Sequence, residues 1–219
     1  MYPRPVTHIR QIEITSRCNL RCVYCTSPNL GRPKVDMTEE IFQKVLDLAA
    51  RWMKGGTQDR ISLCGIGEPT IHPQFIQFLR LAREKLPEGI LDVTTNGVKF
   101  TAEMARTLAD CNIFLGISMH RPEIAGRAAF LAEQYGVAFK SHCDPVMTPT
   151  NWAGQVEWRM GVEKYPCPWL RQGGIMVMAD GRITTCCFDS TGEGVVGTID
   201  DAMWLVKPWQ LCKTCHQFP

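Results

Sequence analysis

The sequence predicts an α/β fold in which βα units build a parallel sheet, followed by a smaller cysteine-rich unit. Short β-rich runs alternate with helical patterns over the first two thirds of the chain. Prolines interrupt the chain after about residue 145, and no long amphipathic pattern follows them. The chain also carries 11 cysteines in 219 residues, gathered near its beginning and its end.

Five runs have the apolar, β-branched character of strands. They are residues 9–15, 60–64, 90–95, 112–118 and 137–143. A sixth strand is less clear, because only residues 156–160 alternate suitably before Cys167. We therefore expect about five or six parallel strands.

Four segments between these strands have helical periodicity. The first follows Thr38 as its N-cap and ends at Gly55-Gly56. The second starts with Pro73 in its first turn and stops before Pro87. Two weaker helices are expected over residues 102–109 and 122–135.

A hairpin is expected in the second unit. Residues 175–178 and 182–185 flank Ala179-Asp180-Gly181, and Asp-Gly tolerates the positive φ of a hairpin turn. We place the boundary between the two units after residue 145, which gives domains of 1–145 and 146–219.

Composition limits the classes of function. A formal net charge of +2 gives no argument for a nucleic-acid or anionic membrane partner. The sequence shows no signal-peptide pattern and no apolar run of membrane-spanning length, so we expect a soluble, cytoplasmic protein. In that reducing compartment, so many cysteines indicate metal binding rather than disulfides.

The first cysteine group lies directly after the first predicted strand. Cys18-Asn19-Leu20-Arg21-Cys22-Val23-Tyr24-Cys25 places three thiols on one loop. Soft thiolates at this spacing suit an iron–sulfur cluster or zinc. Three cysteines leave one iron of a 4Fe-4S cube open to another ligand. A zinc knuckle would need a fourth ligand, and the loop contains no histidine.

This CxxxCxxC spacing, with an aromatic residue before its third cysteine, resembles the radical S-adenosylmethionine (SAM) superfamily. The resemblance implies a partial (β/α) TIM-like barrel and a 4Fe-4S cluster on Cys18, Cys22 and Cys25. It implies SAM at the open iron and an external flavodoxin- or ferredoxin-type reductant. Reductive cleavage of SAM would give a 5′-deoxyadenosyl radical.

Later segments match the same superfamily in order along the chain. Leu63-Cys64-Gly65-Ile66-Gly67-Glu68-Pro69 is similar to its GGEP motif, with Ile66 as a departure, and Thr94-Thr95-Asn96-Gly97 is similar to its TNG motif. Each follows a predicted strand, and the carboxyl ends of parallel strands form the functional face of a barrel. The resemblance implies SAM contacts at Tyr24, Gly65, Gly67, Glu68, Asn96 and Ser118.

The second cysteine group has the spacing CX13GX4C–gap–CXXC, with Gly181 at the hairpin turn. This spacing resembles the twitch domain, a shortened SPASM extension. It implies a second, fully ligated 4Fe-4S cluster held by Cys167, Cys186, Cys212 and Cys215. Cys187 competes with Cys186 as a ligand, and a zinc ribbon on the same thiols is the alternative.

The expected reaction is hydrogen abstraction from a small polar substrate, such as an alcohol, amino sugar, nucleotide or amino acid, for oxidation or rearrangement. The alternatives are modification of a peptide or protein side chain, modification of a nucleic-acid base, and a non-enzymatic iron–sulfur or zinc protein. The nucleic-acid alternative uses an aromatic and basic surface that could equally be packing between the two units. Its residues are Trp152, Trp158, Arg159, Lys164 and Arg171.

An oxidation needs a base, for which Asp189 is the first choice and His120 the second. An epimerisation needs a thiol hydrogen donor, for which Cys143 and Cys187 are the candidates. Cysteines outside these groups are expected to be buried as small apolar side chains.

Overall fold

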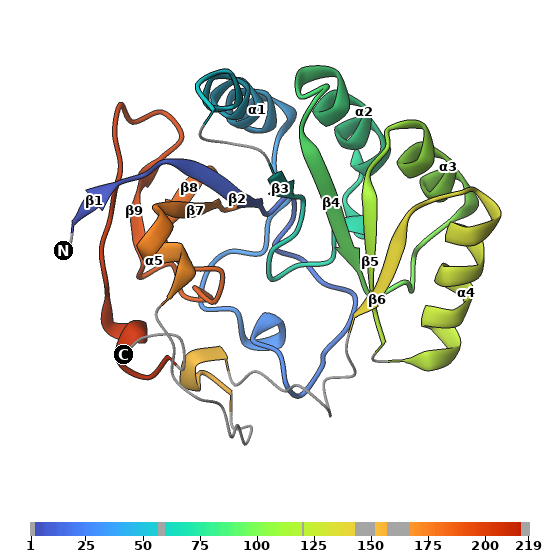
Figure 1. The fold of residues 1–219 in the computed structure, drawn as a ribbon. Coiled ribbons are helices and arrows are strands. Elements are labelled where there is room, and N and C mark those ends of the chain that lie inside the picture. The colour runs from blue at the N-terminus through green and yellow to red at the C-terminus, as the bar shows by residue number, and fades with distance from the viewer. Residues whose placement is uncertain (1–2, 57–59, 120, 143–151, 157–166, 216–219) are drawn as a thin grey trace.

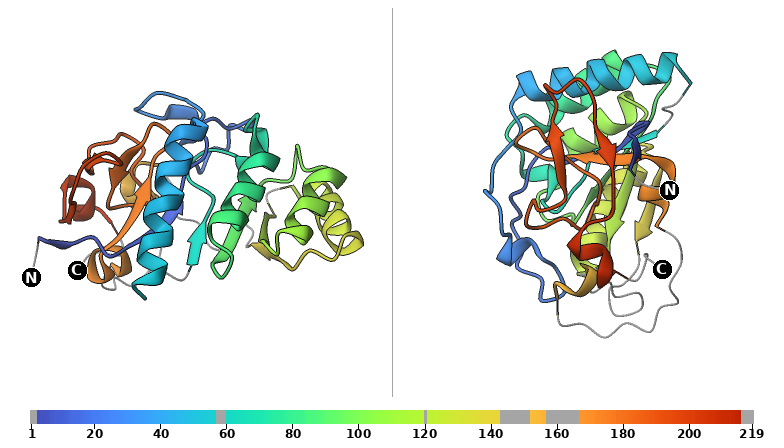
Figure 2. Two further views of the ribbon diagram at one scale, coloured as in Figure 1. Left: turned by 90° about the horizontal axis from the view of Figure 1, so that it is seen from above. Right: turned by 90° about the vertical axis from the view of Figure 1, so that its left-hand side faces the viewer.

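The computed structural model describes residues 3–56, 60–119, 121–142, 152–156 and 167–215. Its centre is one sheet of eight strands in the order β6-β5-β4-β3-β2-β7-β8-β9. Helices follow one another around the outside of this sheet, as Figures 1 and 2 show. The α/β class and the partial barrel predicted from the sequence are confirmed.

Six consecutive strands of this sheet are parallel. Five match the predicted segments within a few residues: β2 (His8–Ile12), β3 (Arg60–Ser62), β4 (Ile90–Thr95), β5 (Phe114–Ser118) and β6 (Phe139–His142). The sixth is β7 (Gly174–Val177), which pairs with the free edge of β2. Most of the predicted strand at 156–160 lies outside the described residues.

The four predicted helices are confirmed as α1 (Glu39–Lys54), α2 (Phe75–Lys85), α3 (Ala102–Asp110) and α4 (Pro122–Gln134). Thr38 caps α1 by accepting a hydrogen bond from the Ile41 backbone N–H at 3.3 Å. No helix among the described residues is long and apolar enough to cross a bilayer.

Helices α1 to α4 cover one face of the sheet, and none of these four covers the other face. Alternate strand residues such as Ile61, Val93 and Leu115 are buried in the core beneath the helices. Because strand side chains alternate, neighbours such as Ser62 and Asp92 lie on the opposite, concave face. The concave face is therefore polar, and it is where a barrel holds its ligands.

The C-terminal segment extends the same sheet. β7, β8 (Arg182–Thr184) and β9 (Val195–Thr198) form an antiparallel meander, and Gly181 takes φ +83° at the predicted turn. β1 (Arg4–Pro5) pairs with β10 (Leu205–Val206), and α5 (Pro168–Gln172) precedes β7. Short 3-10 helices lie at Ser27–Asn29, Pro69–Ile71, Trp152–Gly154 and Gln210–Lys213.

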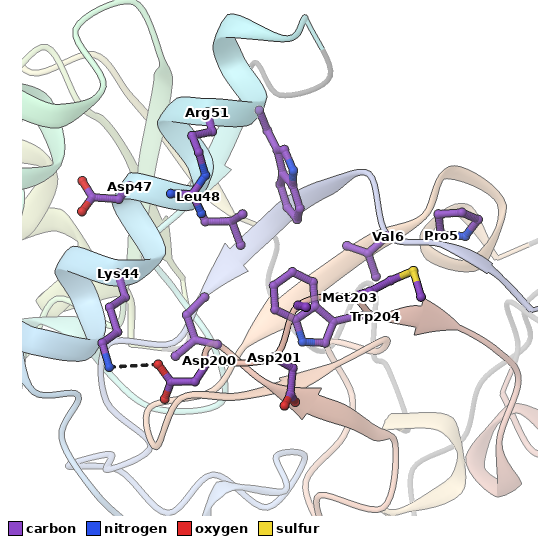
Figure 3. Close-up of a pocket in the computed structure, with 13 residues that line it drawn as sticks. Pro5, Val6, Lys44, Asp47, Leu48, Arg51, Asp200, Asp201, Met203 and Trp204 are labelled. Atoms are coloured by element: carbon purple, nitrogen blue, oxygen red, sulfur yellow. Dashed lines mark hydrogen bonds and ion pairs between the residues drawn. The ribbon is translucent and has the colours of Figure 1, made fainter.

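On the outer surface, α1 contacts the C-terminal segment of the chain. A groove lies between α1 and the segment that leads into β10, and Figure 3 shows the ion pair of Lys44 with Asp200 at 2.9 Å across it. Trp52 and Trp204 meet there edge to face, with ring centroids 6.3 Å apart. α1 is thereby attached to the C-terminal segment on the side away from the concave face.

Candidate active site and cysteine groups

The first cysteine group lies on a loop that leaves β2 and is fastened at its base. Ser16 donates its backbone N–H to the Val35 carbonyl at 2.9 Å, and Met37 donates to the Ile14 carbonyl at 2.8 Å. These bonds join the two ends of the loop like a short ladder. The thiols between them are therefore carried on a closed loop at the carboxyl end of the sheet.

A buried ion pair supports this loop from below. Arg32 holds both carboxylate oxygens of Glu13 at 2.7 and 2.8 Å, with neither side chain more than 2% exposed. The same carboxylate accepts hydrogen bonds from the backbone N–H groups of Ile66 at 3.0 Å and Ala179 at 3.3 Å. Glu13 therefore ties together the cysteine loop, the glycine-rich segment and the C-terminal hairpin.

The three thiols of the loop influence one another. Burial raises the pKa of Cys18, and burial raises that of Cys25 to about 11, with further contributions from the neighbouring thiols. Backbone N–H groups of Leu20 and Ser27 each donate to a thiol sulfur, those of Cys18 and Cys25, at 3.4 Å. Metal binding here must displace protons from neutral thiols.

The glycines of the second motif are required by close packing. A Cβ on Gly67 would lie 2.1 Å from the Thr15 carbonyl oxygen, and one on Gly65 would lie 2.5 Å from the Glu13 side chain. The segment therefore lies against the chain that leads into the cysteine loop. Only glycine permits this approach.

Glu68 is buried and braces the strand ends. Its carboxylate accepts hydrogen bonds from the Thr70 and Thr95 hydroxyls at 2.6 Å and from the Asn96 backbone N–H at 2.7 Å. Burial raises its pKa against the effect of these bonds. The Asn96 amide in turn donates to the Asn19 side chain at 2.9 Å, which brings the third motif to the cysteine loop.

The remaining predicted cofactor contacts lie at the same level. Ser118 ends β5 on the concave face, in register with the last residue of β6. Tyr24 lies between the second and third cysteines of the loop, and burial together with a hydrogen bond to Cys22 raises its pKa. The structure thus gathers the predicted contacts at the carboxyl ends of β2 to β5.

The second cysteine group lines one small cavity. Its four predicted thiols are joined there by Leu170, Thr185, Trp209 and Leu211. The Thr185 hydroxyl and the Trp209 indole N–H are buried without a hydrogen-bond partner. Burial raises the pKa of Cys186 well above its usual range, and neighbouring thiols, including Cys215 and Cys167, raise it further. In the described residues, no three His, Cys, Asp or Glu side chains form a site for a single metal ion.

Cys186 and Cys187 have different surroundings. Cys186 lines the cavity, whereas Cys187 packs with Met176 and Met178 and interacts with Cys64. Burial raises the pKa of both Cys64 and Cys187 to about 12. Cys64, which we expected only as a packing residue, also contacts the Ser62 hydroxyl at 3.0 Å on the concave face.

Asp189 is bound within its own loop. Its buried carboxylate accepts hydrogen bonds from the Thr184 hydroxyl at 2.8 Å and from the backbone of Gly192 and Gly194 at 2.7 and 3.0 Å. These contacts are those of a carboxylate that shapes a turn. Of the other acid–base candidates, His120 and Cys143 lie outside the described residues.

A short segment that the sequence did not single out for this role connects the cysteine groups. Trp152 donates its indole N–H to the Tyr24 carbonyl at 3.0 Å, and its ring lies 5.4 Å from that of Phe188. Gln155 donates to the Phe188 carbonyl at 2.7 Å, and Thr214 donates to the Ala153 carbonyl. Trp152 therefore packs between the first cysteine loop and Phe188, whereas Trp158, Arg159 and Lys164 lie outside the described residues.

Comparison with known proteins now decides the family. Residues 12–124 match the radical SAM superfamily. The chain belongs to this superfamily. Members of this superfamily use SAM and a 4Fe-4S cluster, and the chain is accordingly an enzyme of the radical SAM superfamily.

Two curated relatives share the N-terminal half. A tungsten-containing aldehyde ferredoxin oxidoreductase cofactor-modifying protein from Pyrococcus furiosus is 38% identical over 104 residues, which cover 48% of this chain and 28% of that protein. GTP 3′,8-cyclase from Heliobacterium modesticaldum is 35% identical over 125 residues, which cover 53% of this chain and 36% of the cyclase. The match thus spans about a third of the length of these relatives.

Two solved structures share the fold over most of the chain. BtrN in complex with AdoMet (SAM) and 2-DOIA has a TM-score of 0.70 and 19% identity, covering 90% of this chain and 80% of BtrN. The anSMEcpe structure with AdoMet and the Cp18Cys peptide has a TM-score of 0.64 and 16% identity, covering 90% and 78%. The likeness therefore extends beyond the region matched by the family, into the C-terminal segment.

Proposed function

We propose that this radical SAM enzyme abstracts hydrogen from a small polar substrate and oxidises or rearranges it, with a second cluster beside the reaction chamber. The observation that carries the proposal is the cavity lined by Cys167, Cys186, Cys212 and Cys215. Its residues belong to the C-terminal segment, whose strand β7 pairs with β2.

Cys18, Cys22 and Cys25 would hold the SAM-binding cluster. The loop fits this role because its thiols are close together and two of them, Cys18 and Cys25, receive backbone N–H bonds, which are typical of thiolates bound to iron–sulfur clusters. When bound and reduced, this group supplies the electron that cleaves SAM to a 5′-deoxyadenosyl radical. Glu13 and Arg32 would keep the loop in place during this chemistry.

The SAM contacts would come from residues at the strand ends, namely Tyr24, Gly65, Gly67, Glu68, Asn96 and Ser118. The hydrogen bonds of Glu68 to Thr95 and Asn96 support a positioning role, because they fix the edge against which the cofactor would lie. The close approach of Gly67 to the Thr15 carbonyl fixes the glycine-rich segment, which would lie against the cofactor from the other side.

The four thiols of the cavity would hold the auxiliary 4Fe-4S cluster. Four protein ligands leave no iron open, so this cluster would accept or carry an electron rather than bind SAM. The unpartnered donors of Thr185 and Trp209 support the assignment, because buried donors need acceptors and cluster sulfurs supply them. Cys186 fits the cavity better than Cys187.

The neighbours support two substrate classes. BtrN has been solved in complex with 2-DOIA, which favours a small polar molecule. The anSMEcpe structures contain peptides, which keeps a peptide or protein side chain as the second candidate. A nucleic-acid base is less favoured, because the described tryptophan of the predicted surface, Trp152, is engaged in packing.

Replacing Cys18, Cys22 and Cys25 together with alanine tests the first cluster. The variant and the wild type are reconstituted anaerobically and assayed for 5′-deoxyadenosine, which the variant should fail to produce. Cys111→Ala is the matched control, since Cys111 lies at the end of α3. Undiminished production by the triple variant would overturn the assignment.

Metal analysis tests the auxiliary cluster. The reconstituted wild type should approach about eight irons per chain, on the order of two 4Fe-4S cubes. Cys186→Ala should fall to about four irons, whereas Cys187→Ala should keep about eight. About four irons with one zinc in the wild type would favour a zinc ribbon instead.

Product analysis in deuterated water distinguishes oxidation from epimerisation. An oxidised product is two hydrogens lighter, whereas a thiol donor would carry solvent deuterium into carbon. Asp189→Asn and His120→Gln test the base, and Cys143→Ala and Cys187→Ala test the donor. If all four turn over substrate at the wild-type rate, the acid–base or hydrogen-donating group lies elsewhere.

A further inference from the structure

The concave face is organised in levels across the strands. The registers place Gln11, Ser62, Asp92 and Phe114 side by side on β2 to β5, with Met176 of β7 next to Gln11. Ser118 stands four residues further along β5, about 13 Å at the rise of a strand. The polar level therefore lies below the proposed cofactor contacts.

A bulge in β2 places the side chain of Arg10 beside this level. β2 advances two residues, from Ile9 to Gln11, while β7 advances one, from Ile175 to Met176. Such a bulge turns an extra side chain toward the face of its neighbour. Arg10 accordingly lies across Gly174, and its guanidinium is 5.5 Å from the Trp169 ring centroid. Trp169 packs with Met176 on the concave side.

Arg10 differs from the arginines that pair with the carboxylates of this face. The buried Arg32 is paired with Glu13, and the largely exposed Arg60 lies 2.9 Å from the Asp92 carboxylate. No described carboxylate or carbonyl accepts a hydrogen bond from Arg10, and its Nε is buried without a partner. The side-chain oxygen of Gln11 is likewise buried without a partner. A buried polar group without a hydrogen bond costs stability, so a ligand that forms hydrogen bonds with these groups gains binding free energy.

The charge of the concave face points to an anionic ligand. Of its buried carboxylates in the described chain, Glu13 and Asp92 are already paired with arginines. Glu68, at the strand ends, is held by hydroxyl and backbone N–H groups, and burial raises its pKa, which favours the neutral acid. Lys140 lies on the same face in register with Gly116, and it forms no ion pair among the described residues. Arg10 and Lys140 therefore leave an excess of positive charge on the face where the substrate would bind.

We infer that Arg10, with Gln11, binds an oxyanion of the substrate, either a carboxylate or a phosphate group. A guanidinium stacked on an aromatic ring keeps its planar fork ready for two parallel hydrogen bonds to such a group. The Gln11 oxygen would accept a hydrogen bond from a neighbouring hydroxyl or amine of the same molecule. The inference rests on the proposed function, because it assumes that the substrate lies between this level and SAM.

The test measures anion binding to the anaerobic, reconstituted enzyme with SAM. Inorganic phosphate and acetate are titrated separately by calorimetry, with chloride holding the ionic strength constant. We expect one of the two anions to bind saturably at one site. Arg10→Gln should weaken that binding at least about tenfold, the loss expected for a charge-assisted hydrogen-bond pair. Arg10→Lys should be intermediate.

Arg171→Gln is the matched control, since Arg171 is exposed on α5 close to Trp169 in sequence. It should bind the anion as the wild type does. A second measurement needs no variant: the binding anion should protect Arg10 from phenylglyoxal, as followed by peptide mass spectrometry. The preferred anion assigns the oxyanion to phosphate or carboxylate.

Two results would overturn the inference. One is the absence of saturable binding of either anion to the wild type. The other is equal binding by Arg10→Gln in a variant that has normal circular dichroism and iron content. Failure of the wild type to form 5′-deoxyadenosine would instead reject the proposed function, since anion binding is measured without reduction.

Discussion

The two cysteine groups of this protein differ in how the chain encloses them. The first lies on a loop, with three thiols close to exposed residues such as Val23, which is 79% exposed. The second lines one small cavity, with four thiols and two apolar leucines. A loop with three ligands beside exposed residues suits a site that must admit a cofactor, whereas a cavity with four suits one that only exchanges electrons.

The same comparison applies to what holds each group in place. The loop depends on one buried ion pair and on glycine contacts beneath it. The cavity depends on packing among segments far apart in sequence, including the contact of Trp209 with Gly194. Single substitutions beneath the loop should therefore lower the stability of the protein or the iron content of the first group. Substitutions in the lining of the cavity should mainly change the reduction potential of the second group.

The largest effect is expected from Arg32→Gln. Removing the partner of a buried carboxylate leaves Glu13 uncompensated, which costs about 3–5 kcal/mol of unfolding free energy. Denaturant unfolding of the iron-free protein measures this loss. The exposed pair of Lys44 with Asp200 provides the control, and Lys44→Gln should leave the midpoint unchanged. Equal effects of the two substitutions would contradict the role given to Glu13.

Gly67→Ala should come next. Its Cβ would meet the Thr15 carbonyl oxygen at 2.1 Å, so the loop must shift, at about 1–3 kcal/mol for an overpacked contact. Iron in the first cluster should fall while the cavity stays loaded. Gly126→Ala in α4, where a Cβ meets nothing within 4 Å, should instead stabilise the protein by about 0.5–1 kcal/mol.

Trp209→Phe and Thr185→Val should change the proposed auxiliary cluster without removing it. Each substitution removes a buried, unpartnered donor from a residue that lines the cavity, and donors that reach a cluster stabilise its more negative, reduced state. The reduction potential should become more negative, as followed by a redox titration with electron paramagnetic resonance. Trp204→Phe is the control, because its N–H donates to the Thr198 carbonyl. An unchanged potential in both variants would show that neither donor reaches the cluster.

The smallest effect concerns the pH dependence of the iron-free protein. Burial raises the pKa of Cys64 to about 12 from an ordinary value of 9.0, which favours the neutral thiol in the folded state. The resulting stability is fully present below pH 9.0 and is lost as the pH rises toward 12. Unfolding free energies measured from pH 8 to about 11 should fall less steeply in Cys64→Ser than in the wild type. Parallel slopes would contradict the burial of this thiol.

Local patterns were enough to predict much of the fold. The helix that follows Thr38 and the strand over Ile90–Thr95 were expected within a residue or two, because capping chemistry and apolar periodicity act over short stretches. The cysteine and glycine motifs likewise identified the superfamily, since ligand spacing on a single loop is a property of the sequence.

Other features depended on contacts between distant segments. The sequence indicated a second unit after residue 145, but only the fold shows that its hairpin pairs with β2 and shares the core of the sheet. The pairing of Glu13 with Arg32 had a visible signal, a glutamate inside an apolar run, but its partner lies 19 residues away. Neither strand pairing nor side-chain pairing across such distances leaves a local pattern in the sequence.

By itself, then, the sequence determined the family, the order of the elements and the spacing of the thiols, because these rest on neighbouring residues. Only the tertiary structure decided which of Cys186 and Cys187 faces the cavity, that Asp189 is bound by its own loop, and that the Nε of Arg10 is buried without a hydrogen-bond partner among the described residues. Burial, hydrogen bonding and charge pairing are set by what surrounds a side chain in space, and packing of remote segments creates those surroundings.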